Sequence, residues 1–196
     1  MTLVQNRIRV ACKVGKRMLI GFDFPFGYPA GFATHLTGQA DVFAVWKMLA
    51  ELIEDAPNNA NNRFEAASAL NQRFAGVGPF WGCPASQPHA DLPEKGSKRT
   101  PDHGMTERRY VDQLVPRAQS CWKLFTTGSV GSQSLLGIAR LEALRQQLPQ
   151  DISVWPFEPL DRPITLAEIK GRKMYCPVAA LHPVPATRRA CAMSVR

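Results

Sequence analysis

Three carboxylates, Asp23, Glu158 and Glu168, stand at or near the carboxyl ends of short apolar segments that have the length of strands. In α/β sheets ligands bind outside these strand ends, so the three side chains could meet in one cleft. Oxygen ligands of this kind hold Mg²⁺ or Mn²⁺, which activates water and neutralises charge during phosphodiester cleavage. The sequence therefore indicates a catalytic site of these three residues, with Asp23 and Glu158 as metal ligands. The alternative is structural: Asp23 would bond the amides of the turn that follows it, and Glu168 would be a solvated strand end.

A glycine- and serine-rich segment, Thr126 to Ser134, opens the strongest helical pattern of the chain. Free amides at a helix N-terminus attract anions, and glycines let a phosphate approach the backbone. The segment lacks the Gly-Lys-Ser/Thr ending of a Walker loop and follows no clear strand. Ordinary helix capping is the alternative to a binding role. The residues expected to contact substrate phosphate are Gly128, Ser129, Gly131 and Ser132.

The segment 76–104 has no helical or strand periodicity, and a loop of this length is usually functional or disordered. It and the residues that follow combine cations with aromatic rings, a combination that can hold a phosphate or a single nucleic-acid strand. We expect Arg99 to bind substrate phosphate, the alternative being charges that are simply solvated. The residues of this group are Phe80, Trp81, Lys95, Lys98, Arg99, Arg108, Arg109 and Tyr110.

The elements that must position these residues follow from hydrophobic spacing. The order helix, strand, several helices, strand, strand predicts a mixed central sheet flanked by helices, in a single α/β domain over residues 1–169. Residues 170–196 have neither helical nor strand periodicity and are expected to form a basic, weakly structured tail. The spacing predicts helices over 4–12, 42–53, 64–74, 107–115 and 131–148, and strands over 18–24, 152–158 and 164–169.

Charge and composition limit the partners. The net charge of the 196 residues is +8, but residues 162–196 hold seven Lys or Arg and one Glu, so the rest of the chain is nearly neutral. The high isoelectric point is therefore weak evidence for a nucleic-acid partner. No apolar stretch has the ~20 residues needed to cross a membrane and no signal peptide is recognisable, so we expect a cytoplasmic protein without a membrane partner. The five scattered cysteines favour isolated thiols over disulfides or a zinc site. No feature indicates an oligomeric state.

Four segments, GFDFPFGYP, KRTPD, GSVGSQSLLGI and VWPFE, together resemble a family of predicted nucleases of unknown function with a ribonuclease H-like fold. The resemblance spans roughly residues 18 to 170. In that family a strand ends in an Asp before a Pro- and Gly-rich turn, as Asp23 does, and an Arg precedes a long helical segment, as Arg99 does. The resemblance implies a sheet-centred fold, a divalent-metal site and phosphodiester cleavage.

One departure from the family pattern bears on activity. Ribonuclease H-like folds begin with a hairpin whose first strand carries an essential Asp, and nothing before Met18 predicts that strand. We therefore expect an N-terminally shortened, incomplete member, and an inactive enzyme is one alternative. A second is a non-catalytic module that binds a nucleotide or a partner through residues 76–104. A third is an accessory protein in the biosynthesis of a phosphate-bearing cofactor, with the helix start at 128–134 as its anion site.

Overall fold

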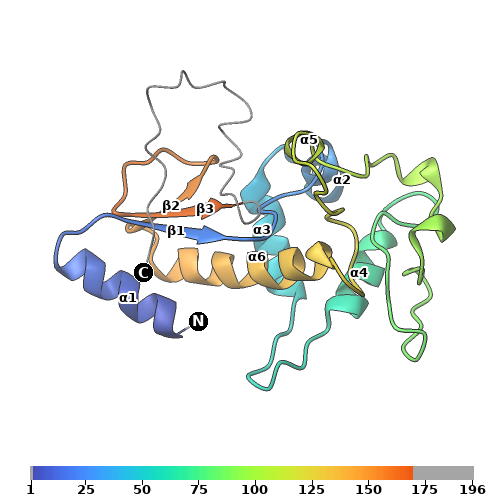
Figure 1. The fold of residues 1–196 in the computed structure, drawn as a ribbon, viewed down its shortest axis with the longest axis horizontal. Coiled ribbons are helices and arrows are strands. Elements are labelled where there is room, and N and C mark those ends of the chain that lie inside the picture. The colour runs from blue at the N-terminus through green and yellow to red at the C-terminus, as the bar shows by residue number, and fades with distance from the viewer. Residues whose placement is uncertain (1, 170–196) are drawn as a thin grey trace. The chain divides into compact units, whose positions relative to one another are not determined.

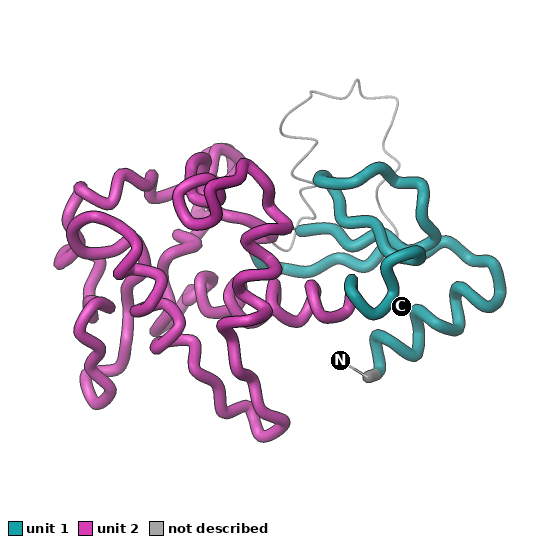
Figure 2. The backbone as a smooth tube through the Cα atoms, turned by 180° about the vertical axis from the view of Figure 1, so that it is seen from behind, with its two compact units in different colours: residues 1–24, 145–196 teal, residues 25–144 magenta. Residues whose placement is uncertain are grey.

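The computed structural model describes residues 2–169 and divides the chain into two compact units (Figures 1 and 2). Of the described residues, unit 1 comprises 2–24 and 145–169, drawn in teal in Figure 2. Unit 2 is the continuous segment 25–144, drawn in magenta. The expected single domain thus consists of two units, one of them discontinuous in sequence. The expected tail, residues 170–196, lies outside the described residues.

Unit 1 is built on a three-stranded parallel sheet with the strand order β1-β3-β2 (Figure 1). The strands are β1 (Met18–Phe22), β2 (Ile152–Trp155) and β3 (Ile164–Glu168). Four of the five residues of the central strand β3 are buried, whereas β1 alternates between half-buried and exposed residues. The central strand β3 pairs with β1 on one edge and with β2 on the other, so its backbone is hydrogen-bonded along both edges.

Helix α1 (Thr2–Lys13) and one face of the sheet supply the apolar core of unit 1. The helix buries Ile8 and Ala11 and ends in a Schellman motif, in which the amide of Lys16 bonds the carbonyl of Ala11 across Gly15. Gly15 has a φ of 65°, a backbone conformation that favours glycine at this position. The predicted helix and its glycine stop are confirmed. The sheet contributes four completely buried side chains: Ile152, Val154, Ile164 and Leu166.

Unit 2 consists mainly of helices joined by long irregular segments. The start of α3 is the one that the sequence predicts, because the carboxylate of Asp41 accepts a hydrogen bond of 2.9 Å from the amide of Phe43. Helix α6 runs past the boundary, so its last turn belongs to unit 1. The helices are α2 (Phe32–Thr37), α3 (Val42–Leu52), α4 (Arg63–Asn71), α5 (Tyr110–Gln113) and α6 (Val130–Gln147), with short 3-10 turns η1 (Gly96–Lys98) and η2 (Pro101–His103).

An aromatic cluster fills the core of unit 2. Both buried indoles hydrogen-bond a backbone carbonyl: Trp46 donates to Phe26 at 2.8 Å, and Trp122 donates to Thr106 at 2.9 Å. These bonds satisfy the polar end of each ring and fix the two irregular segments on the core. The completely or almost completely buried rings are Phe26, Phe32, Trp46, Phe80 and Trp122.

The side chain of Asn71, at the end of α4, holds the start of the long loop in place. Its amide nitrogen donates to the carbonyls of Phe80 at 2.9 Å and Asp91 at 2.7 Å, and its oxygen accepts from the amide of Phe80 at 2.9 Å. Asn71 is only 2% exposed. One buried side chain therefore satisfies three backbone groups that neither a helix nor a sheet supplies with partners.

The described cysteines, Cys12, Cys83 and Cys121, are free thiols, as the sequence predicts. Cys83 and Cys121 are buried, and burial raises the pKa of the Cys121 thiol to about 12. A thiol with such a pKa is protonated and unreactive at neutral pH. Cys176 and Cys191 lie outside the described residues.

Two features of the fold differ from the sequence prediction. Helix α2 was not predicted, because it is short and lies between Gly31 and Gly38, both of which have positive φ. The sheet was predicted to be mixed, but every strand pair in residues 2–169 is parallel. The predicted α/β class is confirmed: the described residues form a small open sheet and helices.

We predict that Asn71→Ala lowers the free energy of unfolding by about 3 kcal/mol, because it leaves three buried backbone groups without partners. Urea denaturation followed by tryptophan fluorescence measures the change. Gln72→Ala is the matched control, since Gln72 is exposed and makes one hydrogen bond to the Asp91 carboxylate. Equal stability of the two variants would show that Asn71 does not support the loop.

Candidate functional site

The parallel sheet brings the carboxyl ends of its strands to one edge, as the arrowheads of β1 and β3 show in Figure 1. Phe22 lies beside Glu168, so Asp23 follows directly beyond the end of the ladder. Residues paired across a sheet share a face, and successive residues alternate between faces. Glu168 therefore lies on the face of Phe22, and Asp23 follows on the opposite face.

Burial agrees with this separation. Glu168 is 7% exposed, on the face that carries the buried side chains of Ile164 and Leu166. Asp23 is exposed and makes no hydrogen bond or ion pair with any residue in the range 2–169. One of the two predicted carboxylates thus belongs to the core of unit 1, and the other faces solvent.

The third carboxylate, Glu158, forms hydrogen bonds and ion pairs within unit 1. One of its oxygens accepts a hydrogen bond of 2.9 Å from the amide of Val154, and the other lies 3.2 Å from a guanidinium nitrogen of Arg162 and 3.9 Å from one of Arg145. The Glu158 side chain is 15% exposed. It closes the turn after β2 and orients Arg162, which also donates to the carbonyl of Ile152. Glu158 therefore holds the short segment 156–163 that returns the chain to β3.

No group of three His, Cys, Asp or Glu side chains among the described residues is placed to hold a metal ion. The arrangement that would let Asp23, Glu158 and Glu168 share Mg²⁺ or Mn²⁺ is thus not formed there. Metal binding by Asp23 and Glu158 stays a prediction from the sequence.

We predict that Glu158→Ala lowers the free energy of unfolding by about 2 kcal/mol in chelator, because it removes the partner of Val154 and leaves Arg162 half-buried without its carboxylate. Thermal or urea unfolding in EDTA measures it. The control is Glu51→Ala, which removes an exposed carboxylate from α3. A residue kept only as a metal ligand would behave in the opposite way, since removing it relieves repulsion in the metal-free protein.

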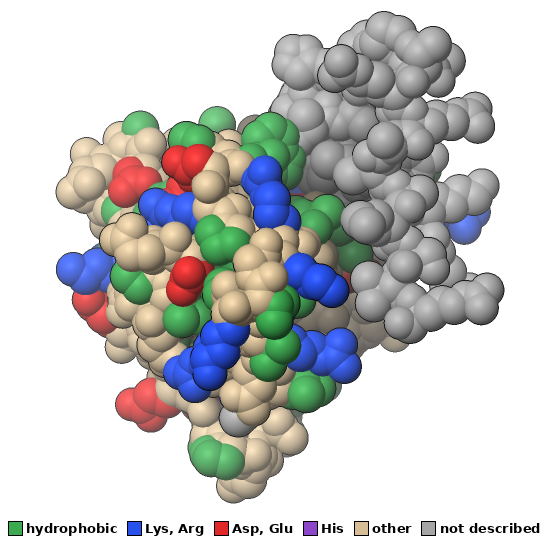
Figure 3. Space-filling view, turned by 90° about the vertical axis from the view of Figure 1, so that its left-hand side faces the viewer, with side chains coloured by type: hydrophobic (Ala, Val, Ile, Leu, Met, Phe, Trp, Pro, Cys, Tyr) green, Lys and Arg blue, Asp and Glu red, His purple; other side chains and the backbone are tan. Residues whose placement is uncertain are grey.

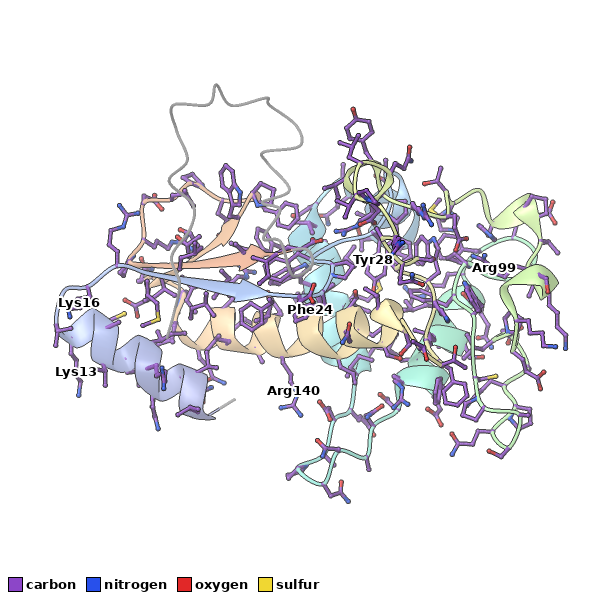
Figure 4. The ribbon with its side chains drawn as sticks, viewed as in Figure 1. Lys13, Lys16, Phe24, Tyr28, Arg99 and Arg140 are labelled. Carbon is purple, nitrogen blue, oxygen red and sulfur yellow. The ribbon has the colours of Figure 1, made fainter. Side chains whose placement is uncertain are left out.

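Arg99, the predicted phosphate ligand, has its guanidinium engaged within unit 2 (Figure 4). It donates to the carbonyls of Gly96 at 3.1 Å and Pro79 at 3.2 Å, and to the carboxylate of Glu107 at 2.6 Å. Its side chain is 14% exposed and lies 5.5 Å from the ring centroid of Trp81. Arg99 therefore joins its own turn to the segment 79–81 and to Glu107, and has little free capacity for a phosphate.

The predicted anion site at residues 128–132 is also occupied by internal contacts. The amide of Gly131 bonds the carbonyl of Lys123 at 2.9 Å, and the hydroxyl of Ser132 donates to the carbonyl of Leu124. A Cβ at Gly131 would lie 2.6 Å from the carbonyl oxygen of Cys121. The glycine is thus required by the close approach of α6 to the segment 121–124. Gly128 has a φ of 77°, a turn conformation that favours glycine, and Ser129 is half-buried.

The Arg99–Glu107 ion pair has a second consequence, because it joins two basic segments. Lys98 and Arg108 are the sequence neighbours of the pair, and both are exposed. Lys95 and Tyr110, at the outer ends of these segments, are exposed as well, Tyr110 by 65%. We call Lys95, Lys98, Arg108 and Tyr110 the loop surface. Cations beside a solvent-exposed ring can hold the backbone and a base of a single strand.

Two of the basic and aromatic residues singled out in the sequence lie elsewhere. Arg109 is paired with the completely buried carboxylate of Asp112 at 2.8 Å and is itself half-buried. Phe80 belongs to the aromatic core and is fully buried. These two residues stabilise unit 2 and do not belong to the loop surface.

A further basic surface, which was not predicted from the sequence, lies on helix α1 and the turn after it. Its cations are exposed, and there is no acidic residue before Asp23. Figure 3, viewed from the α1 side of Figure 1, shows basic side chains among apolar ones, and Figure 4 shows Lys13 and Lys16 at the end of the helix. A count of charge over the first 22 residues would have found this group, which consists of Arg7, Arg9, Lys13, Lys16 and Arg17.

Comparisons with protein-family models, with curated proteins and with solved structures give no match for the chain. The resemblance to predicted nucleases therefore stays a prediction. Among the described residues, no helix combines the length and apolar character needed to cross a membrane.

Proposed function

We propose that the chain is a non-catalytic module that binds single-stranded nucleic acid through the loop surface. The observation that carries the proposal is the Arg99–Glu107 ion pair at 2.6 Å, which ties the segments of Lys98 and Arg108 together. Exposed cations held at fixed positions attract a phosphate backbone by releasing its counterions. Tyr110 adds an exposed ring on which a base can stack.

Further contacts hold the segments on either side of the Arg99–Glu107 pair. Thr100 accepts a hydrogen bond of 3.0 Å from the amide of Val77 through its hydroxyl, and its own amide bonds the carbonyl of Val77. Gly96 lies against the indole of Trp81, where a Cβ would be 3.1 Å from Cε2. Little conformational freedom is left to lose in these segments on binding, which favours affinity.

We further propose that the sheet of unit 1 belongs to a ribonuclease H-like fold. In support, β1 is followed by Asp23 and then by the Pro- and Gly-rich turn, as in the family that the sequence resembles. The proposal favours binding over cleavage, because Glu158 and Arg99 already serve internal contacts in residues 2–169. Phosphodiester cleavage with Mg²⁺ or Mn²⁺ is the competing function.

We predict that the triple variant Lys95→Gln, Lys98→Gln, Arg108→Gln weakens binding of a fluorescent single-stranded oligonucleotide roughly 100-fold at about 0.1 M salt. Three lost phosphate contacts should also reduce the slope of log Kd against log salt by about 2. Fluorescence anisotropy measures both quantities. Circular dichroism and a thermal melt check that the variant remains folded.

The matched control is Arg9→Gln, Lys13→Gln, Lys16→Gln, which removes the same charge from the α1 surface. The proposal expects a change of less than about threefold in this variant, from long-range attraction alone. Equal losses in the two triple variants would mean unspecific charge attraction, and a loss confined to the α1 variant would move the site to α1. Chelator-sensitive cleavage of the oligonucleotide by the wild type, abolished by Asp23→Asn, would replace binding with the competing function.

A further inference from the structure

Strand β1 is an edge strand of the sheet that residues 2–169 form. In the order β1-β3-β2 no described strand lies beyond it. The amide of Met18 bonds the carbonyl of Pro163, and the carbonyl of Phe22 accepts from the amide of Ile169, so the backbone groups of residues 18, 20 and 22 face β3. Because these groups alternate in direction along a strand, the N–H and C=O groups of Leu19 and Gly21 point away from the sheet.

The sequence of β1 carries three fewer obstacles to pairing than many edge strands do, since charge, proline and a bulge are all missing from residues 18–22. An uncharged edge of this kind is a template for another strand. The exposed face of β1 and its flanks consists of four residues in alternation, and Leu19 is 52% exposed. These residues are Arg17, Leu19, Gly21 and Asp23.

We propose that this edge pairs with β1 of a second copy of the chain, antiparallel and about a two-fold axis at Ile20. Leu19 then lies opposite Gly21 of the second copy, and the two residues exchange both of their free backbone hydrogen bonds. Arg17 lies opposite Asp23 of the second copy, on the same face. The edge is thus complementary to itself in hydrogen bonding, in size and in charge.

The charges select this register among the two-fold arrangements that keep the outward groups paired. An axis at Leu19 would set Arg17 against Gly21 and would leave Asp23 without a facing cation. An axis at Gly21 would set the exposed Leu19 against Asp23. Only the axis at Ile20 brings both opposite charges face to face, twice in the dimer, and opposite charges on facing positions stabilise a strand pair.

In this register Leu19 of one copy faces Gly21 of the other, beside an apolar side chain. The side chain of Ile169 lies over Gly21, where a Cβ would be 2.9 Å from its Cγ2 atom. Leu19 of the second copy, facing Gly21, therefore meets an apolar neighbour. The contact covers two of the exposed large side chains of the dimer, and burial of apolar surface supplies most of the association free energy.

Sedimentation of the full chain, with charge exchange at the facing positions, tests the interface. The wild type is expected to be a concentration-dependent dimer. Arg17→Asp or Asp23→Arg alone sets like charges against each other twice and should raise the dimer Kd about tenfold, whereas the two together should restore it. Lys16→Asp with Asp23→Arg is the matched control: its net charge equals that of the double exchange, but no opposite charges face each other, so it should not restore the dimer.

Disulfide trapping tests the axis directly. Residues on a two-fold axis in a non-hydrogen-bonded pair have Cα atoms about 4.5 Å apart, within the range for a disulfide. In a background with Cys12, Cys176 and Cys191 changed to Ser, Ile20→Cys should form a covalent dimer under mild oxidation. Met18→Cys, which faces Phe22 of the second copy, should not.

Three results would overturn the proposal: a wild type that stays monomeric at the highest soluble concentration, a dimer unaffected by the charge exchange, or equal cross-linking of the two cysteine variants. A monomer that binds an unrelated extended peptide at β1 would assign the edge to a different partner and would also overturn it. None of the substituted residues belongs to the loop surface, so these outcomes are independent of the oligonucleotide assay.

Discussion

A buried peptide group must find a hydrogen-bond partner, and in unit 2 this requirement falls on a few side chains. The segment 76–104 has only isolated β-bridges and short 3-10 turns, yet Phe80 within it is fully buried. Asn71 supplies partners for three backbone groups, Arg99 for two carbonyls and Thr100 for the amide of Val77. With these contacts an irregular segment becomes a fixed surface, since few of its buried polar groups remain free to rearrange.

The same requirement explains why chemically capable residues are found in internal roles. Glu158 satisfies the amide of Val154 at the turn after β2, and Ser132 satisfies the carbonyl of Leu124 beside α6. Carboxylates, guanidinium groups and hydroxyls are also the groups that bind metals and phosphates. Residue type and position along the chain do not separate these uses, because the partner of each side chain is set by residues distant in sequence.

The predictable part of the fold is the part governed by local sequence. The apolar run of β1, the cap of α3 at Asp41 and the long apolar spacing of α6 all identify their elements. Strand direction was not predictable in the same way, because the pairing of Phe22 with Glu168 joins opposite ends of the chain. For the candidate site, the cations of the loop surface could be named from the sequence, but their joining by Arg99 and Glu107 could not. Only the fold shows that Arg99 joins these segments through its ion pair with Glu107.

Because unit 1 is discontinuous in sequence, it can complete its folding only late in synthesis on the ribosome. Unit 2 is continuous and can begin to fold while the chain is still being made, whereas β1 must wait for β3 before its inner edge has a partner. At typical elongation rates this interval lasts roughly 7–30 s. Throughout it, both edges of an uncharged strand are open, and a nascent chain in that state is a substrate for chaperones and for aggregation with its neighbours on the same messenger.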